Sequence, residues 1–174
     1  MKKKYQVFIS STYEDLKDER MAVMQCLLDN DCIPVGMEQF PASGMSQMEY
    51  IMKMLDDCDY YILILAGRYG SLDKDGIGFT EKEFNYAESK GIPIMSFLFR
   101  DISKLPLQKC EESDERRKML GNFCNKVSTR LVKYFDDIGS LKCEVATSIN
   151  KCIKDYPADG WVRGNEIEAL LQEI

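Results

Sequence analysis

Short apolar runs alternate with amphipathic stretches along the chain as far as Phe99. Four runs rich in β-branched and aromatic residues predict strands, at residues 5–10, 32–37, 59–66 and 92–99. Between these runs, apolar residues recur at helical spacing and predict helices, at residues 15–30, 46–57 and 80–90. The run from Asp59 to Ala66 is apolar almost throughout, which is typical of a strand buried on both faces of a parallel sheet.

Beyond Phe99 the pattern weakens but keeps the same order. It predicts a long helix at residues 111–131, a short strand at 132–135 and a last helix at 140–155. Because strands and helices alternate strictly, we expect an α/β fold: a three-layer, doubly wound parallel sheet of about five strands in the flavodoxin-like order 2-1-3-4-5. The domain is expected over residues 1–156, with a C-terminal tail or start of a linker, including a final helical turn, at 157–174.

The composition of the 174-residue chain is that of a globular protein, with 45% hydrophobic and 30% charged residues. Its net charge of -6 and the lack of a basic stripe argue against nucleic-acid binding. No apolar run approaches the roughly 18 residues needed to cross a bilayer. Because the sequence enters its first strand almost at once, we expect no signal peptide. We therefore expect a cytoplasmic protein that binds neither nucleic acid nor membrane.

The chain contains no histidine and seven cysteines. Catalysis by a Ser-His-Asp or Cys-His arrangement is therefore impossible within the chain, as is a histidine-based metal site. The cysteines are odd in number, form no C-x-x-C pair and fall within apolar segments, which indicates reduced thiols rather than a disulfide or zinc framework. We expect no metal and no required cofactor, and any acid or base must be a carboxylate, Lys, Tyr or Cys.

Polar and aromatic residues gather in the segments expected at the carboxyl ends of the first three strands, where ligands bind in this type of fold. The mixture of hydroxyls, carboxylates, an arginine and aromatic rings suits a nucleotide better than a purely apolar ligand. The candidate ligand-binding residues are Ser10, Ser11, Thr12, Glu38, Phe40, Arg68, Tyr69 and Tyr86.

These residues also have purely structural interpretations. The hydroxyls lie at a helix N-terminus, which favours an anion, but Ser11-x-x-Glu14 equally has the spacing of a capping box. Arg68 can clamp a phosphate or carboxylate, or pair with an acidic residue among residues 73–81. The aromatic rings can stack on a base or pack in the core.

Glu83 falls about one turn into the helix after the third strand, so its carboxylate can point back toward the expected cleft. A carboxylate beside a ribose can act as a nucleophile or stabilise an oxocarbenium-like transition state, as in glycoside cleavage. Thr80-x-x-Glu83 is also spaced as a capping box, in which Glu83 would only bind the backbone of the cap residue. The spacing leaves both roles open.

Five stretches of the chain resemble, in order, a family of domains of unknown function (family 4062) that is related to TIR domains and nucleoside deoxyribosyltransferases. The first is Phe-Ile-Ser-Ser-Thr-Tyr-Glu-Asp-Leu, within Val7 to Arg20. The others are Pro34 to Phe40, Tyr61 to Gly70, Phe79 to Ala87 and Gly160 to Arg163. Because they cover nearly the whole chain, the resemblance implies the TIR-like version of the fold.

The resemblance also implies a role for Glu83. NAD-cleaving TIR domains carry a catalytic glutamate early in the helix after the third strand, followed by a bulky apolar residue, and Glu83-Phe84 is similar. Deoxyribosyltransferases place a nucleophilic glutamate in a comparable helix. Domains of this kind often precede NTPase or repeat modules in signalling and antiphage defence proteins, so the chain is either a stand-alone protein or an excised domain.

Two functions of different class follow. The first is an enzyme, an NAD glycohydrolase or a nucleoside or nucleotide glycosyltransferase, with NAD or a related nucleotide as substrate and Glu83 as the catalytic carboxylate. The second is a non-catalytic nucleotide-sensing or self-association module that forms homo-oligomers, since the Trp-Cys pair that usually precedes the TIR glutamate is absent here. A plain structural domain is a third, smaller possibility.

Overall fold

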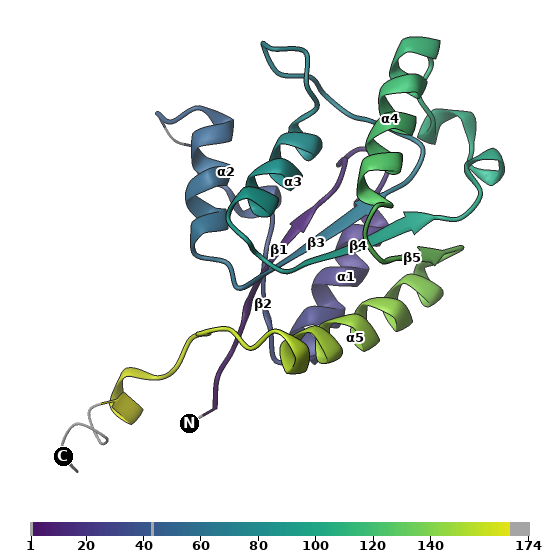
Figure 1. Cartoon of the computed structure of the whole chain (residues 1–174). Helices are drawn as coiled ribbons and strands as arrows, with labels where there is room; N and C mark the ends of the chain where they lie inside the picture. Colours follow the sequence, from purple (N-terminus) through teal and green to yellow (C-terminus); the bar gives the residue numbers. More distant parts are fainter. Residues whose placement is uncertain (1, 43, 168–174) are drawn as a thin grey trace.

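Five parallel strands form the centre of the molecule. The computed structural model describes residues 2–42 and 44–167. Within them, a single all-parallel sheet has the order β2-β1-β3-β4-β5 (Figure 1). The strands are β1 Gln6–Ser10, β2 Ile33–Val35, β3 Tyr60–Leu65, β4 Ile94–Phe99 and β5 Val132–Phe135. The predicted fold class and strand order are confirmed, and the short fifth strand has the predicted bounds.

Helices cover both faces of the sheet and complete three layers. The helices are α1 Lys17–Asp29, α2 Gln47–Asp56, α3 Phe79–Ser89, α4 Asp114–Val127 and α5 Ile138–Asp155, with short 3-10 turns at Met37–Gln39, Ile102–Lys104 and Leu107–Lys109. Figure 1 shows α1 and α5 on one face and α2, α3 and α4 on the other. Every predicted helix is present, and α4 is shorter at both ends than the pattern predicts.

The third strand shows why its apolar run is unbroken. Tyr60, Ile62 and Ile64 pack into the core beneath α1 and α5, whereas Tyr61, Leu63 and Leu65 pack into the core beneath α2, α3 and α4. Successive side chains of a strand point to opposite faces, so a strand with helices on both sides needs apolar residues at every position.

Neither of the two capping boxes that the spacing allows is formed at the edge where ligands are expected. Helix α1 begins at Lys17, after the cap residue Leu16, and Glu14 instead pairs with Lys17 at 2.8 Å. Helix α3 begins at Phe79 after Gly78, with no side-chain cap, so Thr80 lies inside the first turn. In both stretches the polar side chains therefore line the cleft instead of capping a helix.

The end of the chain returns to the first strand. Lys4 and Trp161 form an antiparallel bridge, and the Tyr60 hydroxyl donates a hydrogen bond to the carbonyl of Tyr156 at 2.7 Å. A helical turn is present at 164–167, and the rest of the expected tail lies outside the described residues. The domain boundary at residue 156 stays a prediction.

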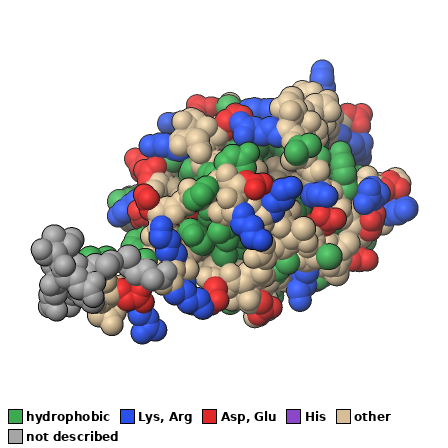
Figure 2. Space-filling model, turned by 60° about the horizontal axis from the view of Figure 1, so that its bottom comes forward, with side chains coloured by type: hydrophobic (Ala, Val, Ile, Leu, Met, Phe, Trp, Pro, Cys, Tyr) green, Lys and Arg blue, Asp and Glu red, His purple; other side chains and the backbone are tan. Residues whose placement is uncertain are grey.

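The surface carries charges of both signs. On the underside of the molecule, Lys and Arg side chains are interspersed with Asp and Glu side chains, and hydrophobic side chains lie between them in small groups (Figure 2). Among the described residues, every helix is too short or too polar to cross a bilayer.

Candidate functional site

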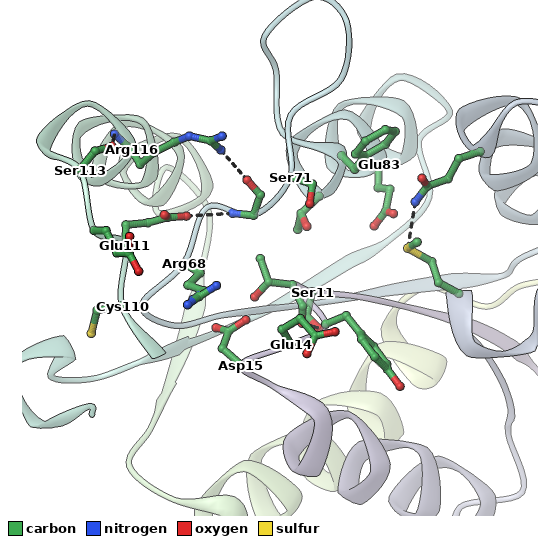
Figure 3. A pocket seen from close by; sticks show the side chains of 18 residues that line it. Ser11, Glu14, Asp15, Arg68, Ser71, Glu83, Cys110, Glu111, Ser113 and Arg116 are labelled. Carbon is green, nitrogen blue, oxygen red and sulfur yellow. Dashed lines mark hydrogen bonds between the residues drawn. The ribbon is translucent and has the colours of Figure 1, made fainter. Parts of the chain in front are cut away.

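A cleft of about 620 Å³ opens at the carboxyl edge of the sheet, beside the ends of β1 and β3 (Figure 3). In the strand order 2-1-3, this is the switch point at which successive crossovers turn to opposite sides, so the loops diverge and leave a crevice. Its walls come from the loop after β1, the loop after β3, the start of α3 and the segment that leads into α4. The lining residues used below are Ser11, Thr12, Glu14, Asp15, Arg68, Gly70, Glu83, Glu111, Glu112 and Arg116.

Glu83 forms part of the inner wall of the cleft. It lies on α3, is 2% exposed, and accepts a hydrogen bond at Oε2 from the hydroxyl of Ser10, the last residue of β1. Among the described residues no partner binds Oε1, and Figure 3 shows the carboxylate pointing into the cleft. Glu83 does not fold back onto the start of its own helix, so the capping interpretation of this residue is not realised.

The surroundings of Glu83 hold its carboxyl group close to half ionised at neutral pH. Burial raises its pKa from 4.5 to about 7, while the Ser10 hydrogen bond and the positive charge of Arg20 lower the pKa and the negative charge of Glu38 raises it. A buried carboxyl whose pKa lies near the working pH is suited to chemistry that needs its charged form in a largely dry site.

A buried arginine connects Glu83's neighbourhood to the loop after β2. Arg20 of α1 is 3% exposed, and its Nε and NH2 groups donate to the two carboxylate oxygens of Glu38, the second at 2.8 Å. Its NH1 group donates to Ser11 Oγ at 2.8 Å, and Ser11 Oγ in turn donates to the carbonyl of Thr12 at 2.7 Å. The pairing holds the pKa of the Glu38 carboxyl below its usual value against the opposing effect of burial. This network fixes the loop after β1 from behind.

The loops after β1 and β3 come into close contact at Gly70. Its φ of +92° lies in the left-handed region, and a Cβ at this position would come within 2.7 Å of Thr12 Cγ2. The loop after β3 is also held from the other side, because the Glu111 carboxylate accepts hydrogen bonds from the backbone N–H groups of Tyr69 and Gly70 at 2.7 and 3.1 Å. Arg116 donates to the Gly70 carbonyl at 2.6 Å.

Polar groups on these two loops lack partners. Both carboxylate oxygens of Asp15, the hydroxyl of Thr12 and the Nε of Arg68 are buried without a hydrogen bond. Burial raises the pKa of the Asp15 carboxyl, although the nearby Thr12 hydroxyl and the charges of Arg68 and Lys109 lower it. Arg68 pairs with no acidic residue among residues 73–81; its NH2 group donates to the carbonyl of Gln108 at 2.7 Å.

The structure brings Ser11, Thr12, Arg68 and Glu83 together in the lining of the cleft, with Ser10 buried behind Glu83, and places the other candidates elsewhere. Glu38 lies behind the loop after β1, paired with Arg20. Phe40 packs against Tyr50 with ring centroids 4.6 Å apart. The remaining two are tyrosines on or near α3.

The ring of Tyr69 is buried against Phe123, and its hydroxyl donates to Glu81 at 2.5 Å and accepts from the N–H of Gly78. The Tyr86 hydroxyl donates to Asp56 at 2.7 Å, which joins α3 to α2. For these two aromatic residues, packing accounts for the contacts that are seen.

Two residues at the site carry no assignment from the sequence, Arg20 and Asp15. Arg20 lies on the stripe formed by Leu16, Val23 and Leu27, which faces the core. A charged residue on a buried stripe requires a buried partner, and that signal is visible in the sequence. Asp15 follows the loop after β1 directly, but nothing in its spacing distinguishes it from the other acidic residues nearby.

Within residues 2–42 and 44–167, no three His, Cys, Asp or Glu side chains come together as the ligands of a metal ion. All seven cysteines are free thiols. The side chains that line the cleft offer carboxylates, hydroxyls, guanidinium groups and the thiol of Cys110.

The fold and the cleft define the class: a doubly wound α/β domain with a ligand site at its topological switch point. Residues 6–150 match the family described as domain of unknown function (DUF4062), and the chain belongs to this family. This confirms the family recognised from the motifs. No curated protein matches the sequence.

Solved structures with a similar fold include TIR domains and a deoxyribosyltransferase. The TIR domains of the activated Roq1 resistosome, which recognises the pathogen effector XopQ, are 15% identical over 84% of this chain and 84% of that chain, with a TM-score of 0.47. The 2-desoxiribosyltransferase from Leishmania mexicana is 15% identical over 87% and 99%, with a TM-score of 0.49. The RPS4 and RRS1 TIR domain heterodimer is 11% identical over 84% and 96%, with a TM-score of 0.48. At these identities the similarity concerns the fold.

Proposed function

We propose that this domain binds a nucleotide in the cleft and cleaves the N-glycosidic bond of NAD or a related nucleotide, with Glu83 as the catalytic carboxylate. One observation carries the proposal: a buried carboxyl group with a pKa of about 7 faces the cleft at the switch point and is positioned by Ser10. A carboxylate placed in this way is the group that cleavage at a sugar carbon requires.

In this reaction the bond between C1′ of the ribose and the ring nitrogen of nicotinamide breaks, and its electron pair goes to the nitrogen. The sugar carbon becomes positively charged as the bond lengthens, and the ionised Glu83 stabilises that charge or captures the carbon as a covalent intermediate. Water then completes the hydrolysis. Because Ser10 donates to Oε2, Oε1 is the oxygen directed at the substrate.

The charges of the cleft support a substrate with a cationic reacting centre. The acidic residues of its lining outnumber the basic ones: they are Glu14, Asp15, Glu83, Glu111 and Glu112, against Arg68 and Arg116. Glu111 is satisfied by two backbone N–H groups. The remaining carboxylates favour a positively charged nicotinamide ring, while Arg68 offers a donor to phosphate.

The test is an assay for nicotinamide released from NAD at high protein concentration, with Glu83→Gln as the variant. The substitution keeps an acceptor for Ser10 but removes the negative charge, so we expect the rate to fall at least about a hundredfold. Wild-type kcat/KM should rise with pH and level off above about pH 7, because the ionised form is the active one.

The matched control is Glu88→Gln, which neutralises an exposed carboxylate on the same helix that pairs with Arg130. Its turnover should equal that of the wild type. Equal turnover in Glu83→Gln and the wild type would remove Glu83 from the proposal. Nucleotide binding without turnover, in dilute and in self-associated protein, would replace catalysis by a sensing role.

The proposal extends to the setting that the motif resemblance implies. We place the domain in cytoplasmic signalling or antiphage defence, where self-association into homo-oligomers and a downstream NTPase or repeat module would control its activity. Light scattering over a range of protein concentrations, with and without NAD, tests whether the domain self-associates.

A further inference from the structure

Half of the described residues that carry unpartnered buried polar atoms lie together on the loops after β1 and β3. Buried side-chain atoms without a hydrogen bond occur on six described residues, and three of these, Thr12, Asp15 and Arg68, line the same cleft. Asp15 is 3% exposed, yet neither of its carboxylate oxygens has a donor. Buried polar groups in folded proteins nearly always have partners, so a cluster of unpaired ones requires a specific reason.

These groups satisfy one another only in part: the Thr12 hydroxyl is near enough to the Asp15 carboxyl to lower its pKa, but it forms no hydrogen bond of good geometry with it. Figure 3 shows the Asp15 carboxylate and the Arg68 guanidinium pointing toward one another, but no ion pair is formed between them. The backbone on both sides is fixed. Gly70 is in close contact with Thr12, the Glu111 carboxylate accepts a hydrogen bond from the loop after β3, and Arg116 donates one to it. The fixed backbone therefore keeps these groups from moving together into hydrogen-bonding positions.

We propose that Thr12, Asp15 and Arg68 form a subsite for a ribose phosphate, in which Asp15 accepts hydrogen bonds from the vicinal hydroxyl groups of the sugar and Arg68 donates to the phosphate. The inference rests on the proposed function only for the choice of a nucleotide as the ligand. It adds a role for Asp15 that the Glu83 chemistry does not require, and it predicts a preference for ribose over deoxyribose.

The chemistry of the unpaired atoms matches this ligand. An ionised carboxylate has acceptor sites only, so it pairs with neighbouring O–H groups that donate in parallel. The Nε–H of Arg68 is a donor and matches an anionic oxygen. Thr12 supplies a hydroxyl that can donate or accept.

Entry of the ligand requires a side-chain rotation, because the unpaired atoms touch no solvent in the present arrangement. Arg68 is the side chain able to make it. Arg68 is half-buried, and its side chain is held by a single hydrogen bond to the carbonyl of Gln108. Binding is therefore expected to exchange that hydrogen bond for one to the phosphate.

The experiment measures the affinity of the full chain for two probes, ribose 5-phosphate and 2-deoxyribose 5-phosphate, by NMR titration and calorimetry. Wild-type protein should bind the ribose compound about tenfold more tightly, the size expected for one hydrogen bond to a charged group. In Asp15→Asn the affinity for ribose 5-phosphate should fall about tenfold and the preference should disappear. In Arg68→Gln both probes should weaken together, because both carry the phosphate.

The matched control is Asp18→Asn, which changes an exposed carboxylate three residues further along the chain, on α1. It should bind both probes as the wild type does. Spectra of each free variant show whether its fold is retained, and Asp15→Ser provides a second variant without the charge.

The outcomes separate this inference from the proposed function. Binding of ribose 5-phosphate that depends on Asp15 supports the subsite, whether or not NAD is cleaved. No binding by the wild type at millimolar probe, or equal preference for ribose in the wild type and Asp15→Asn, overturns the subsite even where Glu83-dependent turnover is found. If binding of ribose 5-phosphate depends on Asp15 but no turnover depends on Glu83, only the proposed function is overturned.

Discussion

The two ends of the cleft treat buried polar groups in opposite ways. On the Glu83 side the charged groups have partners: Ser10 binds Glu83, and Arg20 binds both Glu38 and Ser11. The one buried polar group there that lacks a partner among the described residues is neutral, the hydroxyl of Tyr61. On the Asp15 side the carboxylate, the Thr12 hydroxyl and the Arg68 Nε are unpaired. A buried group left unpaired destabilises a fold by about 1–3 kcal/mol, whereas a paired one is close to neutral or favourable.

This difference suits the Glu83 end of the cleft to catalysis and the Asp15 end to ligand binding. Burial raises the pKa of Glu83, and its partners oppose that rise and fix the position of the carboxylate, as a group that acts on bonds requires. The unpaired groups lower the stability of the free domain, and a ligand that satisfies them recovers what was lost. Substitutions at the two ends should therefore change stability in opposite directions.

The largest expected effect on stability comes from a substitution on the Glu83 side of the cleft. Arg20→Ala removes a buried cation that binds Glu38 and Ser11, and leaves Glu38, whose side chain is 24% exposed, without its partner. We expect a loss of about 4 kcal/mol in the free energy of unfolding, since breaking a buried pair by removing one member typically destabilises by 3–5 kcal/mol. Urea unfolding at neutral pH measures it.

The comparison for Arg20 is Lys17→Ala on the same helix, because Lys17 pairs with Glu14 at the surface. An exposed pair contributes about 1 kcal/mol or less. Similar losses in the two variants would show that the Arg20 network does not hold the loop after β1.

The second effect concerns the dependence of stability on pH. The folded pKa of Glu83, about 7, lies above its ordinary value of 4.5, so the folded state binds more protons in this range. The stability that protonated Glu83 provides is complete below pH 4.5 and is lost as the pH rises through about 7, a change of about 3 kcal/mol. Unfolding experiments from pH 4.5 to 8 should show this decline.

In Glu83→Gln most of the decline should be absent, because an amide does not titrate. A smaller decline of the same sign remains from Asp15, whose pKa is also raised. An unchanged slope in the variant would mean that the Glu83 carboxyl is not held near neutrality by burial.

These expectations also show how far the sequence alone could go. The fold follows from local pattern: the alternation of runs and amphipathic stretches predicts all five strands. Helix α3 ends within one residue of the predicted end, just before Gly91, whose φ is +69°. Such features depend on neighbours within a few residues. The parallel order then follows from general rules of connection rather than from any single residue.

The site was harder to predict because its contacts join distant parts of the chain. Ser10 and Glu83 are 73 residues apart, and Arg20 and Glu38 are 18 apart. A spacing of three residues before a glutamate fits Ser11, Ser46 and Thr80 equally, yet only Ser46 forms a capping box with Glu49. Where each helix begins decides between a cap and a site, and that depends on packing across the sheet.

The smallest expected effect on stability comes from a substitution on the Asp15 side of the cleft, and it is a gain where Arg20→Ala gives a loss. Asp15→Asn replaces a buried charge that lacks a donor with a neutral group of the same shape, so the free energy of unfolding should rise by about 1 kcal/mol, or about 3 °C in melting temperature. Asp18→Asn makes the same chemical change in the exposed first turn of α1, where the helix dipole favours a negative charge, and should lower stability by about 0.5 kcal/mol. Calorimetric melting of both variants measures the contrast. A lower melting temperature for Asp15→Asn than for Asp18→Asn would mean that the fold itself satisfies Asp15, and the distinction between the two ends of the cleft would disappear.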